Sequence, residues 1–238
     1  MTQRAASFKV EQTGAIVKVT FSRPERLNAL TFQVYEELTG WFERIRQNSS
    51  VRAIVLAGEG DSFCSGGDVK DIIGPLLKRD MQGTLEFTRL TGRLITNIIR
   101  CTKPVVAELK GVIAGAGAVI ALAADLRIAT PECRFAFLFT RVGLAGCDMG
   151  AAYLLPRVVG LGRALEALYL GDFIDAAEAH RIGLVNRIVR KEQIEESSAK
   201  LAAQLCELPA FGLSMTKEMV FKELAMDFEA AIEGEAQA

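Results

Sequence analysis

The stretch Phe63-Cys64-Ser65-Gly66-Gly67-Asp68 decides how this chain folds, together with Gly111-Val112-Ile113-Ala114-Gly115-Ala116-Gly117. Each of these glycine-rich turns follows a short apolar run, residues 53–57 and 104–107, with the composition of a buried strand. The second turn leads into an Ala-rich apolar stretch over residues 116–124. A helix that starts there would offer free N–H groups and the positive end of its dipole at the turn.

Two such turns together predict a pair of main-chain amides aimed at one oxyanion. Small residues are needed at this place, because only a bare backbone lets an enolate or tetrahedral oxygen come close enough to be held. The pair therefore predicts chemistry on an activated acyl group. Each turn also has a purely structural alternative, since strand–glycine–helix turns occur in many α/β proteins for packing reasons alone.

Composition sets limits on the fold and on the partners. The chain has 238 residues, half of them apolar, which suits one large domain or a domain with a small helical appendage. Its net charge of −1 and the lack of a long basic run argue against a nucleic-acid partner. Five scattered cysteines and a single histidine give little support to a metal site. Without a signal segment or an apolar run of membrane length, we expect a cytoplasmic protein with no membrane partner.

Strand and helix patterns alternate along the chain, which predicts an α/β core with helices covering a sheet. The expected strands are residues 8–12, 16–22, 53–57, 104–107 and 184–189. The expected helices are one capped by Thr31, then residues 85–99, 116–124, 151–170 with a break at 159–162, 176–181, 193–205, 212–224 and 227–236.

The two turns and their neighbours resemble the crotonase superfamily, the enoyl-CoA hydratase/isomerase family. The resemblance also rests on the loop 21–31 before the first turn and on the segments 124–129 and 134–137 after the second. It runs from about Phe8 to Phe221. It implies a crotonase-like spiral of repeated ββα units over residues 1–190 and a helical trimerisation region over residues 191–238. It also implies that the chain forms a homotrimer or a dimer of trimers. Because relatives usually continue through further helix, we expect a truncated C-terminus.

The resemblance also implies the positions of the binding groups. The oxyanion-hole amides match Ser65 and Ala116, whose structural alternatives are an ordinary turn residue and a simple helix start. No tightly bound cofactor is expected, since coenzyme A would enter as part of the thioester substrate. Its contacts match the following residues of two segments: Arg26, Leu27, Ala29, Gly67, Asp68 and Val69. Arg26 could neutralise a phosphate or could simply be solvated, whereas Asn28 and Thr31 are expected to cap the next helix.

The acid–base residues depart from the family pattern. Hydratases of this fold hold the attacking water between two glutamates, and the matching positions here are Val119 and Phe139, which cannot transfer a proton. Asp148 resembles an aspartate that reaches the acyl group in several branches of the superfamily, including dienoyl-CoA isomerases and naphthoate synthases, although the loop is about one residue longer here. Its alternative is an ordinary N-cap of a helix that begins at Met149. Cys64 and Cys147, which adjoin Ser65 and Asp148, are expected to be small buried residues.

The resemblance therefore implies an acyl-CoA-processing lyase or isomerase, of the kind found in fatty acid metabolism, that stabilises a thioester enolate. The reaction could be hydration or isomerisation through Asp148, hydrolysis, decarboxylation or another C–C cleavage. A non-catalytic CoA-binding scaffold is the alternative. An unrelated nucleotide-binding domain is disfavoured, because no phosphate-loop motif occurs and Gly115-Ala116-Gly117 lacks the third glycine of a dinucleotide fingerprint.

Overall fold

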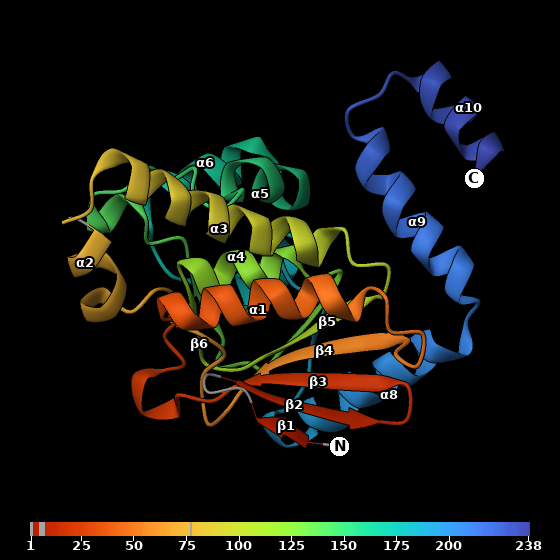
Figure 1. Ribbon diagram of the computed structural model, residues 1–238, viewed down its shortest axis with the longest axis horizontal. Helices are drawn as coiled ribbons and strands as arrows, with labels where there is room; N and C mark the ends of the chain where they lie inside the picture. Colours follow the sequence, from red (N-terminus) through yellow and green to blue (C-terminus); the bar gives the residue numbers. More distant parts are fainter. Residues whose placement is uncertain (1, 5–7, 77) are drawn as a thin grey trace.

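The computed structural model describes residues 2–4, 8–76 and 78–238, and its centre is a seven-stranded sheet beneath a layer of helices (Figure 1). The strands of this sheet, in spatial order, are β1 (Thr2–Arg4), β2 (Phe8–Thr13), β3 (Ile16–Phe21), β4 (Ala53–Gly58), β5 (Val105–Leu109), β7 (Leu126–Ala129) and β10 (Arg187–Ile188). A second sheet contains β6 (Val112–Ala114), β8 (Arg134–Ala136) and β9 (Ile174–Asp175).

Helices follow most of the strands, as expected for parallel strands joined by crossovers. They are α1 (Phe32–Ile45), α2 (Gly74–Leu76), α3 (Met81–Ile99), α4 (Ala116–Ala123), α5 (Ala151–Val159), α6 (Leu161–Leu170), α7 (Ala176–Arg181), α8 (Ile194–Glu207), α9 (Ala210–Glu223) and α10 (Phe228–Gln237). None of the helices in the described ranges combines the length and the apolar character that crossing a bilayer requires.

The central strands are buried on both faces. Strand β4 pairs in parallel with β3 and β5, and all six of its residues are buried. Ile54 and Leu56 point into the larger core, whereas Ala53 and Val55 pack with Ile194 and its neighbours on α8. Helices therefore cover the sheet from both sides, which explains why β4 is a continuous apolar run without alternation.

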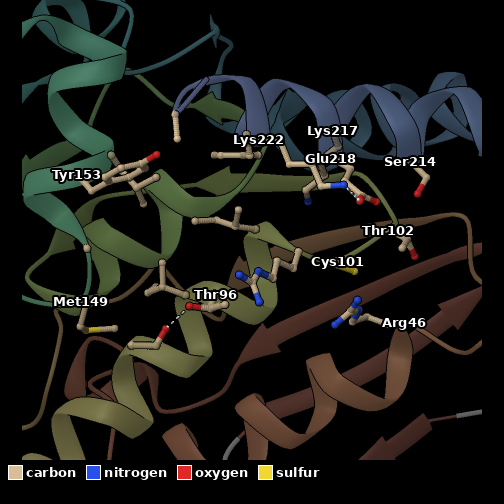
Figure 2. Close-up of a pocket in the computed structure, with 18 residues that line it drawn as sticks. Arg46, Thr96, Cys101, Thr102, Met149, Tyr153, Ser214, Lys217, Glu218 and Lys222 are labelled. Carbon is tan, nitrogen blue, oxygen red and sulfur yellow. Dashed lines mark hydrogen bonds and ion pairs between the residues drawn. The ribbon is translucent and has the colours of Figure 1, made fainter. Parts of the chain in front are cut away.

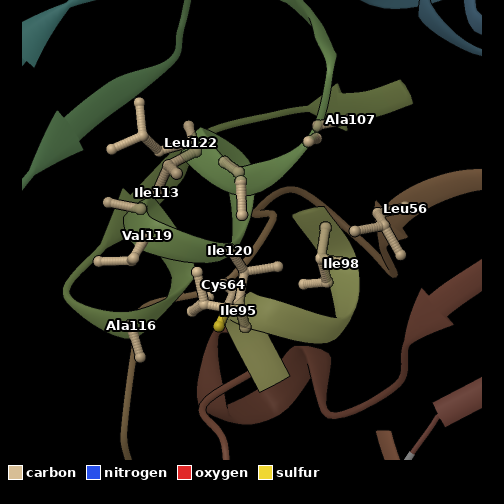
Figure 3. Packing of buried hydrophobic residues seen from close by; sticks show 14 of the residues in the cluster. Leu56, Cys64, Ile95, Ile98, Ala107, Ile113, Ala116, Val119, Ile120 and Leu122 are labelled. Atoms are coloured by element: carbon tan, nitrogen blue, oxygen red, sulfur yellow. The ribbon is translucent and has the colours of Figure 1, made fainter. Parts of the chain in front are cut away.

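Helix α4 forms the centre of the larger core. All eight of its residues are buried, and a helix that is apolar on every side has no solvent face. Figure 3 shows Val119, Ile120 and Leu122 of this helix among Ile95 and Ile98 of α3 and other apolar residues. The start of α4, which carries the second glycine turn, is consequently held in place by packing.

The C-terminal helices divide into one that belongs to the sheet and two that extend from the body. On α8, the hydroxyl of Ser198 donates to the buried carboxylate of Glu108 at 2.6 Å, and Lys18 reaches the same group at 3.0 Å. Helices α9 and α10 project away from the core (Figure 1). Helix α9 is tied down by Lys217, whose ammonium contacts Asp125 at 2.8 Å and the carbonyl of Ile98 at 3.1 Å.

Several boundaries differ from those expected. The predicted strand over residues 184–189 is reduced to Arg187–Ile188, because only these two residues pair with β7. Helix α3 begins at Met81, four residues early, since the side chain of Asp80 accepts from the amide of Gly83 and caps the helix. The break within 151–170 is confirmed at Gly160, whose φ of 83° belongs to the left-handed region that favours glycine.

Candidate functional site

The two glycine turns are in direct backbone contact. The amide of Ala114 donates to the carbonyl of Cys64 at 2.9 Å, and the amide of Cys64 donates to the carbonyl of Val112 at 3.2 Å. A Cβ atom placed on Gly117 would lie 2.3 Å from the carbonyl oxygen of Cys64, inside van der Waals contact. Glycine at position 117 is therefore required by the close approach of α4 to the first turn.

Both turns open into one cavity of about 320 Å³. Its described lining contains one carboxylate, that of Asp148, and no lysine, arginine or histidine. Most of the remaining lining is apolar or hydroxylic, and comes from the turns, from α1, from α3 and from the loop before α5. These residues include Tyr35, Ser65, Gly66, Gly67, Phe87, Thr88, Thr91, Gly115, Ala116, Phe139, Leu144 and Cys147.

Ala116 presents a free amide at this cavity. It is the first residue of α4, and the first hydrogen bond within the helix runs from the amide of Val119 to the carbonyl of Gly115 at 3.2 Å. Among the described residues the N–H of Ala116 has no partner, as expected at a helix N-terminus. This amide can therefore donate to a ligand, helped by the helix dipole.

Ser65 lines the same cavity, but its amide is already engaged. The N–H of Ser65 donates to the carbonyl of Leu27 at 3.0 Å. Leu27 and the next residue, Asn28, have φ values of 49° and 56°, a left-handed conformation that is uncommon outside glycine. No motif or periodicity in the sequence predicts this contact. An oxyanion at Ser65 would have to share or replace the Leu27 carbonyl.

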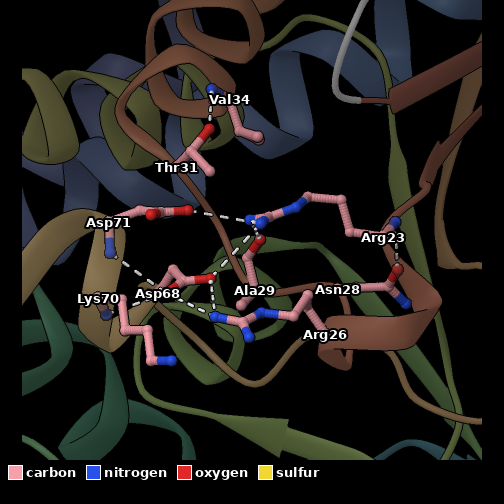
Figure 4. A network of polar contacts seen from close by, with 9 residues as sticks. All are labelled: Arg23, Arg26, Asn28, Ala29, Thr31, Val34, Asp68, Lys70 and Asp71. Atoms are coloured by element: carbon pink, nitrogen blue, oxygen red, sulfur yellow. Dashed lines mark hydrogen bonds and ion pairs between the residues drawn. The ribbon is translucent and has the colours of Figure 1, made fainter.

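The loop before α1 is fastened to the first turn by ion pairs (Figure 4). Arg26 contacts the buried carboxylate of Asp68 at 3.1 Å, and Arg23 contacts it at 3.5 Å. Burial alone would raise the pKa of Asp68, but amide hydrogen bonds from Asp71 and Lys70 and the guanidinium of Arg26 outweigh it and lower the pKa. Asp68 is therefore ionised at neutral pH, and its described contacts hold the loop and the turn together.

The residues expected to contact coenzyme A lie beside the cavity. Gly67 lines it, whereas Arg26, Leu27, Ala29 and Asp68 are outside the described lining. The side chain of Arg26 is 43% exposed, so part of the guanidinium faces solvent. Val69 begins a π-helical turn, Val69–Ile73, and its side chain falls outside the described part of the chain.

Of the two capping residues expected before α1, only Thr31 has this role. Its side chain accepts from the amide of Val34. The expectation for Asn28 is wrong, because its amide group donates to the carbonyls of Glu59 and Ser62 and holds the loop instead.

Asp148 does not cap the helix that follows it. Helix α5 begins at Ala151, and its N-cap, Gly150, makes no side-chain cap hydrogen bond. Met149 and Gly150 have φ values of 51° and 86°, so the chain is not helical directly after Asp148, and the N-cap interpretation is wrong. The carboxylate accepts from the adjacent amide of Met149 at 2.9 Å. Burial raises the pKa of Asp148, and the Met149 amide offsets only part of that rise.

The two positions where hydratases carry glutamate hold apolar side chains that are buried here. Val119 lies in the core, and Phe139 contributes an apolar wall to the cavity. Cys64 is buried as expected, which raises its pKa to about 12 and keeps the thiol neutral. For Cys147 the expectation of burial is wrong: it is exposed, and it lies among the residues that line the cavity.

A second, larger cavity of about 750 Å³ lies between α3, the start of α5 and α9. Figure 2 shows Lys217, Glu218 and Lys222 on one side of it and Arg46 and Thr96 on the other. Its described lining contains no residue of either glycine turn, and it shares Met149 with the smaller cavity. In the described part of the chain, no three or more His, Cys, Asp or Glu side chains converge as metal ligands would. The smaller cavity is therefore the better candidate for chemistry.

The family model for enoyl-CoA hydratase/isomerase matches residues 11–238. The chain belongs to this family. The α/β fold expected from the resemblance is thereby confirmed as that of the crotonase superfamily. A crystal structure assigned to an enoyl-CoA hydratase of Streptomyces coelicolor A3(2) superposes with a TM-score of 0.95 at 50% identity, covering 97% of this chain and 84% of the other.

Relatives within the enoyl-CoA hydratase/isomerase family carry out different reactions. The 1,2-epoxyphenylacetyl-CoA isomerase of Escherichia coli K12 is 32% identical over 206 residues, which are 86% of this chain and 78% of the relative. The 4-chlorobenzoyl coenzyme A dehalogenase-2 of an Arthrobacter species is 30% identical over 230 residues, 96% of this chain and 82% of the relative. Family membership supports an enzyme that acts on acyl-CoA. Because the relatives differ in reaction, the reaction of this chain has to be inferred from the residues of the site.

The close approach of the two turns predicts a severe effect of Gly117→Ala in this family member. The added methyl group would meet the backbone of Cys64, which cannot move away as a flexible side chain would, so we expect a loss of about 3 kcal/mol of unfolding free energy. Urea denaturation measures this loss. Gly162→Ala on α6 is the matched control, since nothing lies within 4 Å of its added methyl group, and it should change stability by no more than about 1 kcal/mol. Equal stabilities of the two variants would contradict the packing argument.

The raised pKa of Asp148 predicts a pH-dependent cost to stability. The folded protein binds the proton of this carboxyl more tightly than the unfolded chain does. The contribution of Asp148 to the free energy of unfolding is therefore most favourable below the ordinary pKa of 3.8, and it is lost as pH rises through the pKa of the folded state. Asp148→Asn should therefore have a higher melting temperature than the wild type at pH 7, with a smaller difference near pH 4. Thermal denaturation across this range tests it, with Glu235→Gln on α10 as control. A variant less stable than wild type at pH 7 would refute it.

Proposed function

We propose that this protein isomerises an acyl-CoA thioester, with Asp148 as the group that moves the proton. The observation that carries the proposal is the composition of the smaller cavity. Its described lining brings both glycine turns together with a single carboxylate. The thioester oxygen would lie at the free amide of Ala116, with the Ser65 amide as second donor once the Leu27 carbonyl gives way.

Oxyanion donors make the acyl carbon next to the thioester acidic. As its C–H bond breaks, the proton passes to the Asp148 carboxylate and the electron pair moves onto the thioester oxygen. Main-chain donors stabilise the negative charge there, each by roughly 3 kcal/mol. The same carboxyl then returns the proton to another carbon of the enolate. A carboxyl with a raised pKa suits both directions of transfer, because it binds and releases a proton more evenly at neutral pH.

Isomerisation fits this lining better than two-glutamate hydration. Hydration needs one group to activate water and a second to supply a proton, and the family's usual positions for both are occupied by Val119 and Phe139. A proton shift within the substrate needs only one group that takes and returns the proton. The similarity to a 1,2-epoxyphenylacetyl-CoA isomerase supports this choice of reaction class.

Coenzyme A would extend from the cavity past the loop before α1. The exposed part of Arg26 is suited to a phosphate, because a guanidinium remains charged while it shares one edge with Asp68. The other contacts proposed are Leu27, Ala29, Gly67, Asp68 and Val69. In this arrangement the Arg26–Asp68 pair holds the loop before α1 against the first glycine turn.

A homotrimer, or a dimer of trimers, is proposed from the family resemblance and supported by exposed apolar side chains on the projecting helices. Phe211, Val220 and Phe228 are 70%, 54% and 74% exposed. Such side chains on projecting helices indicate a surface that a partner covers. Light scattering should give three or six times the mass of one chain, and Phe211→Glu should reduce that mass whereas Lys200→Glu should not. A wild-type mass of one chain would rule out this proposal.

Turnover of an acyl-CoA panel tests the reaction. Enoyl-CoA thioesters with different double-bond positions should be interconverted, and Asp148→Asn should lower kcat about 10²–10⁴-fold while leaving the Kd for the thioester within a few-fold. Exchange of the α-proton in heavy water, followed by NMR, detects the enolate directly. Tight binding of CoA thioesters without turnover or exchange would instead favour the non-catalytic scaffold.

A further inference from the structure

Tyr35 places a hydroxyl group at the acyl cavity that the proposed mechanism does not use. The residue lies on the buried face of α1 and is 2% exposed. Its ring packs edge-on against Phe87, with centroids 5.4 Å apart, so its orientation is fixed. The side chain lines the smaller cavity, and the hydroxyl lies 3.8 Å from the position that a Cβ of Gly67 would occupy.

The hydroxyl has no hydrogen-bond partner among the residues that the structure describes. Among the described residues, the side-chain oxygens that are both fully buried and without a partner belong to Glu37 and Glu223, and the hydroxyl of Tyr35 is not among them. Its polar atom therefore reaches the cavity. A buried hydroxyl is costly unless it is hydrogen-bonded, and none of the described residues supplies a partner. We therefore expect the contents of the cavity to supply it.

Two of the neighbouring hydroxyls, those of Thr88 and Thr91, are already bonded within the protein. The side chain of Thr88 donates to the carbonyl of Leu85 at 3.0 Å, and Thr91 donates to the carbonyl of Thr88 at 3.0 Å. Burial raises the pKa of Tyr35 well above its ordinary value, and the nearby Cys64 and Asp148 raise it further. The phenol is consequently neutral at physiological pH, and it acts as a hydrogen-bond donor and not as a base.

We infer that Tyr35 donates a hydrogen bond to an oxygen that the acyl group carries beyond its thioester carbonyl, such as a hydroxyl, ketone or ether oxygen. This inference rests on the proposed acyl-CoA function and adds the substrate class to it. The thioester oxygen already has its own donors in the turns. The walls near Tyr35, which include Ile72, Leu76 and Phe87, are apolar and would accommodate the carbon skeleton around that oxygen.

A purely hydrocarbon acyl group would be disfavoured for a physical reason. It would displace water from the hydroxyl of Tyr35 and provide no acceptor in its place. A site with a buried donor discriminates strongly against the analogue that lacks the matching group, whereas an apolar pocket discriminates weakly. Tyr35 is therefore assigned a role in specificity, separate from the proton transfer at Asp148.

Calorimetric binding to the full chain tests this inference. The probes are butyryl-CoA, acetoacetyl-CoA, 3-hydroxybutyryl-CoA and 4-hydroxybutyryl-CoA. The wild type should bind at least one oxygenated thioester ten-fold or more tightly than butyryl-CoA, and Tyr35→Phe should reduce that ratio to about two-fold or less. Tyr169→Phe, which changes a tyrosine that is 68% exposed, should keep the wild-type ratio. No preference in the wild type, or an unchanged ratio in Tyr35→Phe, overturns the inference.

Thermal denaturation without ligand separates this role from a structural one. Tyr35→Phe keeps the ring and its packing against Phe87, so the melting temperature should be unchanged or higher. A fall of several degrees would mean that the hydroxyl has a partner within the protein, and would overturn the inference. If no CoA thioester binds to the wild type, the proposed function fails as well. If butyryl-CoA binds to the wild type and Tyr35→Phe leaves the ratio of the two affinities unchanged, the proposed function stands and the role of Tyr35 alone is refuted.

Discussion

The close backbone contact between the two glycine turns is the constraint on which the site depends. Hydrogen bonds at Cys64 join the first turn to β6, and Gly117 lets the start of α4 lie against the same carbonyl. These contacts place a helix N-terminus beside a second main-chain segment without any side chain between them. The cavity opens at this junction, and its lining contains Ala116, with its free amide, and Asp148.

Polar groups around the junction are satisfied by the chain itself wherever a partner is in reach. The Ser65 amide is bonded to Leu27, and the Asp68 carboxylate is surrounded by amides and guanidinium groups. The Ala116 amide and the Tyr35 hydroxyl have no such partner among the described residues, and both residues line the cavity. The distribution of satisfied and unsatisfied donors thus separates the residues that hold the site together from those available to a ligand.

Much of the fold could be predicted from the sequence, because the turns and the apolar periods are local signals. The apolar run at 53–57 and the Ala-rich run after Gly115 correspond directly to β4 and α4. Contacts between distant segments could not be predicted in this way. The bond from Ser65 to Leu27 depends on left-handed backbone at two non-glycine residues, and Asn28 holds the segment near Ser62 instead of capping a helix.

The candidate site was predictable in part. Ser65, Ala116 and Asp148 were identified from motif and resemblance, and the structure brings all three to one cavity. Tyr35 could not be identified as a polar group of the site, because its spacing from Phe32, Leu38 and Trp41 is that of an apolar helix face. Periodicity reports which way a side chain points, but it does not report whether its terminal hydroxyl has a partner.

The complete burial of α4 gives the two donors of the proposed oxyanion site different rigidity. A helix with no solvent face cannot shift without disturbing the packed core, so the Ala116 amide is already in its place before a substrate binds. The Ser65 amide is hydrogen-bonded to the carbonyl of Leu27, an exposed residue of the loop before α1, and becomes free only when that carbonyl moves. In the proposed site, a substrate oxygen can accept from both amides only after the Leu27 carbonyl has moved, so the free energy of rearranging Leu27 would be subtracted from the free energy of binding.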